Sequence, residues 1–158
     1  MKYWLIKSEP TTYSLADLKR DGSCIWDGIR NYQARNFLRK MNRGDLVFFY
    51  HSNTKPPGIV GLVRVIETGI VDPTQFEIDS IYYDEKSTKS APRWLTVAIE
   101  FVEEFPRCIS LGELKQKFDG DELLVIRRGS RLSVMPVGDD VAEKILRMKE
   151  VIEGGSEF

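Results

Sequence analysis

Two apolar runs decide most of what this chain can fold into. Residues 46–50 read L-V-F-F-Y, and residues 59–68 are rich in valine and isoleucine. A short continuous run of aromatic and branched side chains is typical of a strand buried on both faces, so the first run predicts such a strand. The second run predicts a central strand, within which Gly61 indicates a bulge or a close approach of two backbones.

The other elements are predicted from local signals. Two capping boxes, S-L-A-D from Ser14 and S-L-G-E from Ser110, predict helices over 15–20 and up to Phe118. Further expected elements are a strand at 3–7, an alternating and half-exposed strand at 94–101, a strand at 131–134 closed by Pro136, a helix from Tyr32, and a C-terminal helix with the apolar stripe Val141, Ile145, Met148 and Ile152. Residues 72–92 predict a long surface loop. About five or six strands and four helices predict a compact α+β domain with a curved or closed sheet.

Composition limits the class of protein. The 158 residues, 42% of them hydrophobic, fit one domain, expected over 1–150, with 151–158 as a flexible or vector-derived tail. The formal net charge of −1 gives no global attraction to polyanions, so any nucleic-acid contact must be local. Cys24 and Cys108 form no C-x-x-C and His51 is the only histidine, so we expect no metal, no cofactor and a cytoplasmic location. No apolar run approaches a membrane span or a signal peptide.

Residues 24–36, C-I-W-D-G-I-R-N-Y-Q-A-R-N, carry more hydrogen-bonding and stacking groups than a core segment could bury cheaply. Trp26 offers a flat face, assumed to be exposed, and Asn31 both donates and accepts, which suits the edge of a nucleobase. Gly28 permits a sharp turn, and Asn31 is placed to cap a helix that begins at Tyr32. We predict the wall of a binding site. The alternative is that Trp26 is a half-buried core residue and Asn31 only an N-cap.

Six motifs in order resemble the EVE domain, a member of the PUA-like superfamily. They are K-S-E-P at 7–10, W-D-G-I-R-N-Y-Q-A-R-N at 26–36, F-F-Y-H-S-N at 48–53, P-P-G-I-V-G at 56–61, P-R-W at 92–94 and R-L-S-V-M-P-V at 131–137. The resemblance implies a pseudo-barrel of mixed sheet surrounded by short helices. It also implies a pocket like that of YTH domains, which hold a methylated base. Ile29 stands where relatives often have valine, a difference of one methylene.

Several polar residues around these motifs are candidates for binding a base. Ser8 and Glu9 follow the first strand and are placed to hydrogen-bond a base edge, or alternatively to cap a helix or lie at the surface. His51, Ser52 and Asn53 end a buried strand and are predicted to present donors to the cavity. The alternative for His51 is a purely structural hydrogen bond.

Two further sets of residues complete the candidate site. Arg131 and Ser133 share one face of the predicted late strand, which is either the cavity wall, as we favour, or solvent-exposed. Positive charge is concentrated between Gly28 and Gly44 without an acid before Asp45, and this predicts a phosphate-contacting patch or, alternatively, a solvated helix face. The expected phosphate contacts are Arg30, Arg35, Arg39 and Lys40.

Three functions compete. The first is a monomeric, non-catalytic module that reads a modified base in DNA or RNA, stacking it on Trp26. The second is an amidohydrolase, because the related ASCH domains share the PUA-like architecture and some resemble enzymes that act on acylated pyrimidine nucleosides; Lys7 and Glu9 would be its acid–base pair. The third is a sensor of free nucleotides, which would bind a mononucleoside as tightly as an oligonucleotide.

Overall fold

The computed structural model describes residues 1–150 as six strands, four α-helices and two short 3₁₀ helices. The strands are β1 (Tyr3–Ser8), β2 (Ser23–Ile25), β3 (Leu46–His51), β4 (Gly58–Val71), β5 (Leu95–Ser110) and β6 (Val134–Val137). The helices are α1 (Leu15–Asp21), α2 (Tyr32–Lys40), η1 (Pro73–Phe76), α3 (Leu111–Lys117), η2 (Leu124–Ile126) and α4 (Asp139–Met148). The expected tail at 151–158 and the stripe residue Ile152 lie outside the described residues.

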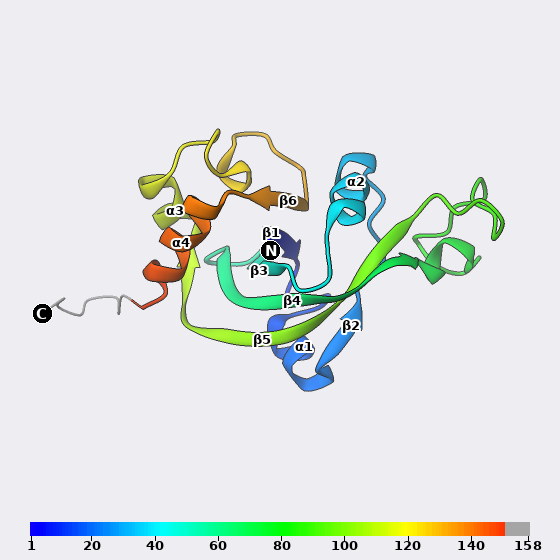
Figure 1. The fold of residues 1–158 in the computed structure, drawn as a ribbon, viewed down its shortest axis with the longest axis horizontal. Helices are drawn as coiled ribbons and strands as arrows, with labels where there is room; N and C mark the ends of the chain where they lie inside the picture. The colour runs from blue at the N-terminus through cyan, green and yellow to red at the C-terminus, as the bar shows by residue number, and fades with distance from the viewer. Residues whose placement is uncertain (151–158) are drawn as a thin grey trace, which may run out of the picture.

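The strands form one mixed sheet in the order β2-β5-β4-β3-β1-β6. Strands β1 and β3 run parallel, and the other neighbouring pairs are antiparallel. Figure 1 shows β4 and β5 curving beneath β1, β3 and β6 and then extending together to one side, where they lead into the segment 72–94. The predicted α+β fold with a curved sheet is confirmed.

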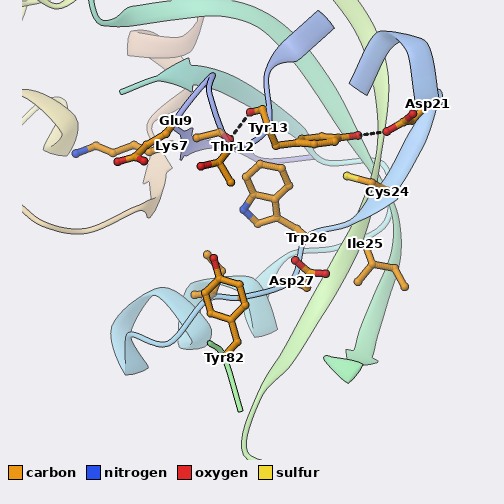
Figure 2. Close-up of a pocket in the computed structure, with 13 residues that line it drawn as sticks. Lys7, Glu9, Thr12, Tyr13, Asp21, Cys24, Ile25, Trp26, Asp27 and Tyr82 are labelled. Atoms are coloured by element: carbon orange, nitrogen blue, oxygen red, sulfur yellow. Dashed lines mark hydrogen bonds between the residues drawn. The ribbon is translucent and has the colours of Figure 1, made fainter. Parts of the chain in front are cut away.

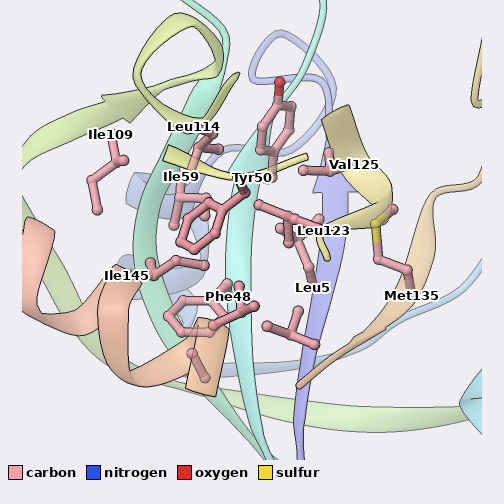
Figure 3. Packing of buried hydrophobic residues seen from close by; sticks show 14 of the residues in the cluster. Leu5, Phe48, Tyr50, Ile59, Ile109, Leu114, Leu123, Val125, Met135 and Ile145 are labelled. Atoms are coloured by element: carbon pink, nitrogen blue, oxygen red, sulfur yellow. The ribbon is translucent and has the colours of Figure 1, made fainter. Parts of the chain in front are cut away.

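The central strands are buried on both faces, as the apolar run predicts. Successive side chains of a strand point to opposite faces, so Phe48 and Tyr50 enter one core cluster while Val47 and Phe49 enter another. The first cluster is covered by α3 and α4, which contribute Leu114 and Ile145 among others (Figure 3). The second is covered by α1 and α2.

Local signals placed the helices correctly. In both capping boxes the serine accepts from the backbone three residues on, and the acidic side chain accepts from the serine's own N–H. Gly61 lies at a shift in the pairing of β3 with β4, and a Cβ there would come within 2.4 Å of both the Glu103 carbonyl oxygen and Leu15 Cδ2. The predicted bulge and close approach are both confirmed.

Two strand predictions are wrong. The late strand is Val134–Val137 and not 131–134, because β6 is an edge strand in which Pro136 can be accommodated without losing a ladder hydrogen bond to a further strand. Arg131 and Ser133 therefore precede the strand and do not share a strand face. Strand β5 continues to Ser110. Residues 96–99 are buried rather than half-exposed, because Val97 and Ile99 pack into the second core cluster and the Thr96 hydroxyl donates to the Trp26 carbonyl oxygen.

The segment between β4 and β5 is mostly irregular, as predicted, but it is tied to the fold. Gln75 is completely buried, and its Nε2 donates to the carbonyl oxygens of Asp72 and Trp94, the two ends of the loop. Trp94 Nε1 donates in turn to Asp84. This segment is a folded extension that carries Tyr82 to the site described below. Within residues 1–150 the helices are all too short or too polar to cross a membrane.

Candidate functional site

A pocket of about 510 Å³ opens between the end of β1, the chain that follows β2, and the segment 72–94. Its lining includes residues 7–9, Tyr13, residues 24–29 and Tyr82 (Figure 2). The K-S-E-P motif and the first half of the W-D-G-I-R-N motif therefore meet at one cavity. Tyr13 closes one side, where its hydroxyl donates to Asp21 at 2.8 Å.

Trp26 is both a core residue and a wall of this pocket. Its side chain packs edge-on against Tyr13 and Phe49, with ring centroids 6.3 and 5.6 Å apart, and only 8% of the residue is exposed. The expectation of an exposed indole face is therefore wrong, since two aromatic neighbours cover it. Its Nε1 is buried and has no hydrogen-bond partner within residues 1–150. Figure 2 shows this nitrogen on the side of the indole that faces the pocket.

Gly28 allows Tyr82 to form the opposite wall. Its φ is +80°, which confirms the predicted sharp turn, and a Cβ at this position would lie 2.8 Å from the Tyr82 ring. Its backbone N–H donates to Asp72 Oδ2 at 2.8 Å. A side chain on this residue would displace the ring that faces Trp26 across the cavity.

Asp72 and Arg30 join the two walls. Asp72 is 2% exposed and accepts from Arg30 Nη1 at 3.0 Å and from the Thr74 backbone N–H at 2.8 Å. Burial alone would raise the pKa of Asp72, but hydrogen bonds from Thr74, Gly28 and Arg30 outweigh it and hold the pKa below its usual value. Arg30 Nε donates to the Tyr82 carbonyl oxygen at 2.9 Å, and its guanidinium lies over the Tyr82 ring.

Sequence reasoning missed this role of Arg30, which we expected to contact phosphate. Four of its five N–H groups already donate, to Tyr82, Ile29, Asp72 and Thr74. Arg30 is thus engaged mainly in joining the two walls, and its contact with phosphate stays a prediction. The one available signal was Asp72 before Pro73, a pairing typical of a helix N-cap, which would have marked Asp72 as an acceptor although not as the partner of Arg30.

Asn31 does not share the pocket of Trp26. Its side chain accepts from the Ala34 backbone N–H at 2.9 Å, so it is the N-cap of α2 as expected. It lines a second, smaller pocket, in which Arg131 also lies. Tyr32 is exposed and stacks on Trp94 at a centroid distance of 5.0 Å. The structure therefore separates Trp26 and Asn31, which the sequence placed at one ligand.

Ser8 and Glu9 line the main pocket. The residues at the end of β3 do not line it, but two of them hydrogen-bond to Ser8 and Glu9. Asn53 Nδ2 donates to Glu9 Oε1 at 3.3 Å, and Ser52 N–H donates to the Ser8 carbonyl oxygen at 2.9 Å. His51 Nε2 accepts from the Leu15 backbone N–H at 3.1 Å, in agreement with the structural alternative for this histidine.

We expect the imidazole of His51 to titrate below its ordinary pKa of 6.5, because burial disfavours its charged form. A depressed pKa in the folded state means that His51 stabilises the fold above pH 6.5, and that this contribution is lost as the pH falls through the lower, folded value. Because His51 is the only histidine, one NMR titration of the imidazole protons measures its pKa without ambiguity. A value of 6.5 or higher would contradict the prediction.

The remaining predicted residues lie outside the main pocket. Arg35 Nη1 donates to the Arg93 carbonyl oxygen at 3.0 Å, and its guanidinium lies 4.8 Å from the Tyr32 ring centroid. Arg35 therefore links α2 to the segment 72–94. Arg39 and Lys40 are exposed at the end of α2, where a phosphate contact remains a prediction. The Ser133 carbonyl oxygen accepts from Lys7 N–H at 2.9 Å. Among residues 1–150, no group of three or more acidic, cysteine or histidine side chains is placed to hold a metal ion.

The fold and its pocket define a PUA-like α+β domain with a cavity between two aromatic walls. The family model of the EVE domain matches residues 2–148, and the chain belongs to that family. Mouse thymocyte nuclear protein 1 is 42% identical over 94% of this chain and 74% of its own length. A solved structure from Pseudomonas syringae is 47% identical, covers 93% of this chain and 99% of its own, and superposes with a TM-score of 0.89.

One solved relative contains DNA. The human THYN1 protein in complex with 5-methylcytosine-containing DNA is 37% identical to this chain, with a TM-score of 0.90 over 96% of this chain and 99% of that one. The Pho92 YTH domain, solved with m6A, superposes with a TM-score of 0.52 at 15% identity, a similarity that concerns the fold alone. The expected likeness of the pocket to that of YTH domains stays a prediction.

The expectation of a cytoplasmic location is wrong. Relatives from chicken, mouse, human, rat and zebrafish all bear the name thymocyte nuclear protein 1. The prediction rested on two cysteines without a disulfide framework, and such usage separates reducing from oxidising compartments only. Nucleus and cytosol are both reducing, so cysteine content does not distinguish them.

Proposed function

We propose that this domain reads a modified base in nucleic acid by taking the base, turned out of its strand, into the pocket between Trp26 and Tyr82. The observation that carries the proposal is the indole Nε1 of Trp26, which is buried at the pocket wall without a hydrogen-bond partner within residues 1–150. Native proteins rarely leave a buried donor unpaired, because doing so costs about 1–3 kcal/mol. A ligand acceptor such as a base carbonyl oxygen or ring nitrogen would satisfy it.

The rest of the pocket suits a base. Its volume of about 510 Å³ lies within the range of small-ligand sites, and Tyr82 offers an aromatic ring opposite Trp26. Asp27 adds a carboxylate that can accept from an exocyclic amine. Base–aromatic stacking contributes about 1–3 kcal/mol, enough for micromolar recognition when joined to two or three hydrogen bonds. The DNA complex of the human relative supports nucleic acid as the partner, and we keep the prediction that the domain binds it as a monomer.

Trp26→Phe tests the proposal, because phenylalanine keeps an aromatic ring but lacks the indole N–H. We expect affinity for the preferred modified oligonucleotide to fall about 10-fold, the equivalent of one lost hydrogen bond of about 1.4 kcal/mol. The measurement is a titration of oligonucleotides that carry 5-methylcytosine or another single modification, each with its plain counterpart. A free mononucleoside measured beside them tests the sensor alternative, which requires equal affinity.

Trp4→Phe is the matched control. Trp4 belongs to the same core cluster, but its Nε1 donates to Asp45 at 2.9 Å and does not line the pocket. This variant removes an indole N–H of the same chemistry and should leave the affinity for the modified oligonucleotide unchanged. An affinity of Trp26→Phe for the modified oligonucleotide equal to that of the wild type would overturn the assignment of Trp26.

The amidohydrolase remains the second candidate because Lys7 and Glu9 both line the pocket and burial lowers the pKa of Lys7. Two observations weaken it. The two side chains form no ion pair within residues 1–150, and Figure 2 shows them pointing away from Trp26. Mass spectrometry of N4-acetylcytidine and methylated nucleosides after incubation should show no change. Turnover that is lost in both Lys7→Ala and Glu9→Gln would establish the enzyme instead.

A further inference from the structure

A second pocket of about 340 Å³ lies between the start of α2 and the segment that links η2 to β6. Three of its lining residues are Arg127, Arg128 and Arg131, and Asn31 and Gln33 face them from α2. No carboxylate lines it. The base-reading function described above leaves this pocket unused.

Two of the three arginines of this pocket are not paired with an acid in the part of the chain that the structure describes. Arg127 Nη2 donates to Asp121 at 3.1 Å, in an exposed pair. Within residues 1–150, Arg128 and Arg131 have neither an ion pair nor a side-chain hydrogen bond. Two guanidinium groups beside one cavity are suited to bidentate recognition of a phosphate, with a geometry that lysine cannot supply.

The start of α2 adds backbone donors to the same cavity. The first N–H groups of a helix have no partner inside the helix, and Asn31 satisfies only that of Ala34 with its side chain. The positive end of the helix dipole also points toward this pocket, since Asn31 and Gln33 line it. These donors reinforce the arginines on which the argument rests.

The two pockets are neighbours. Ile29 lines the first and Asn31 the second, only two residues further along the chain. On the other side, Lys7 lines the first pocket and donates its backbone N–H to Ser133, which directly follows Leu132 of the second. A strand that crosses residues 29–31 can therefore place a base in one pocket and a phosphate beside the other.

We propose that this second pocket binds a backbone phosphate of the strand whose modified base occupies the pocket of Trp26. The inference rests on the proposed function, because it takes the phosphate to belong to the nucleic-acid strand that the domain reads. It adds a phosphate contact at residues 127–131 to the one predicted at the end of α2. Because a phosphate contact carries no sequence information, it sets affinity and position rather than base preference.

The test is the double variant Arg128→Gln/Arg131→Gln, titrated with a plain oligonucleotide and with its modified counterpart at several salt concentrations. We expect affinity to fall about 10-fold for both at low salt, the slope of log affinity against log salt to become shallower by about 1 to 2, and the ratio between the two oligonucleotides to stay constant. Inorganic phosphate, followed by NMR, should shift the amide signals of Gln33 and Ser130 in the wild type and not in the variant.

Lys115→Gln/Lys117→Gln is the matched control, because it removes the same charge from an exposed part of α3. An unchanged salt slope in the arginine variant, or an equal change in the control, would overturn the proposal. Shifts with inorganic phosphate but no change in oligonucleotide affinity would assign the pocket to free phosphate and also overturn it. Failure of the base-reading function is distinguishable, since it would abolish discrimination in the wild type while leaving the salt slope measurable on plain DNA.

Discussion

Trp26→Ala is expected to lower the free energy of unfolding by about 3–5 kcal/mol, the usual cost of removing a buried tryptophan or phenylalanine side chain. The indole fills the space between Tyr13 and Phe49 and is 8% exposed, so its removal leaves a cavity in the second core cluster. A loss of this size is a large share of the stability of a domain this small. The measurement is urea unfolding followed by circular dichroism.

Trp26→Phe separates the two roles of this residue. It preserves most of the ring contacts, so we expect a smaller loss of unfolding free energy, about 1–2 kcal/mol, together with the loss of about 10-fold in affinity for the modified oligonucleotide. Unchanged stability in Trp26→Ala would show that the indole is not part of the core, and the argument from its buried N–H would fail with it. Binding by the alanine variant is informative only where that variant is still folded.

Asp72→Ala is expected to destabilise the domain by about 3 kcal/mol and to weaken binding of the modified oligonucleotide more than 10-fold. The substitution removes the acceptor that Asp72 offers to Arg30 Nη1 and to the Gly28 N–H, and this weakens the link that places Tyr82 opposite Trp26. Partial exposure of Arg30 reduces the cost of its unpaired charge, because water reaches the guanidinium.

The pH dependence of this variant gives a second measurement. The pKa of Asp72 lies below its usual 3.8 in the folded protein, so its charge stabilises the fold above pH 3.8 and this contribution is lost as the pH falls through the folded value. The difference in unfolding free energy between wild type and Asp72→Ala should therefore shrink in acid. Asp79→Ala is the control, an exposed carboxylate in the same segment, and it should change neither stability nor binding. An equal effect of both variants would contradict the role of Asp72.

Elements defined by neighbouring residues were predictable from the sequence. The run at 46–50 predicted a buried strand because all five of its side chains are apolar or aromatic. The capping boxes at Ser14 and Ser110 predicted the bounds of their helices to within one residue. Gly61 signalled a bulge because its missing side chain is itself the cause of the close approach. These features depend on contacts within a few residues, or on one residue alone.

The failures share a different origin. The separation of Trp26 from Asn31, and the pairing of Arg30 with Asp72 across 42 residues, depend on where distant segments meet in space. No local pattern encodes such a meeting. The late strand was misplaced because Pro136 was taken to end it, whereas the effect of proline depends on whether the strand lies at the edge of the sheet. For the base-binding residues, the sequence identified the motifs but not which pocket each one lines.

The link from Arg30 to Tyr82, across 52 residues, makes the pocket a property of the whole folded chain. Any ligand that recognises this arrangement, and not the unfolded chain, must raise the melting temperature. At a concentration 100 times its dissociation constant, such a ligand adds about 2.7 kcal/mol to the free energy of unfolding. A thermal-shift screen of modified oligonucleotides can therefore rank base modifications without labels. Conversely, a substitution far from the cavity that loosens the segment 72–94 would imitate a loss of recognition.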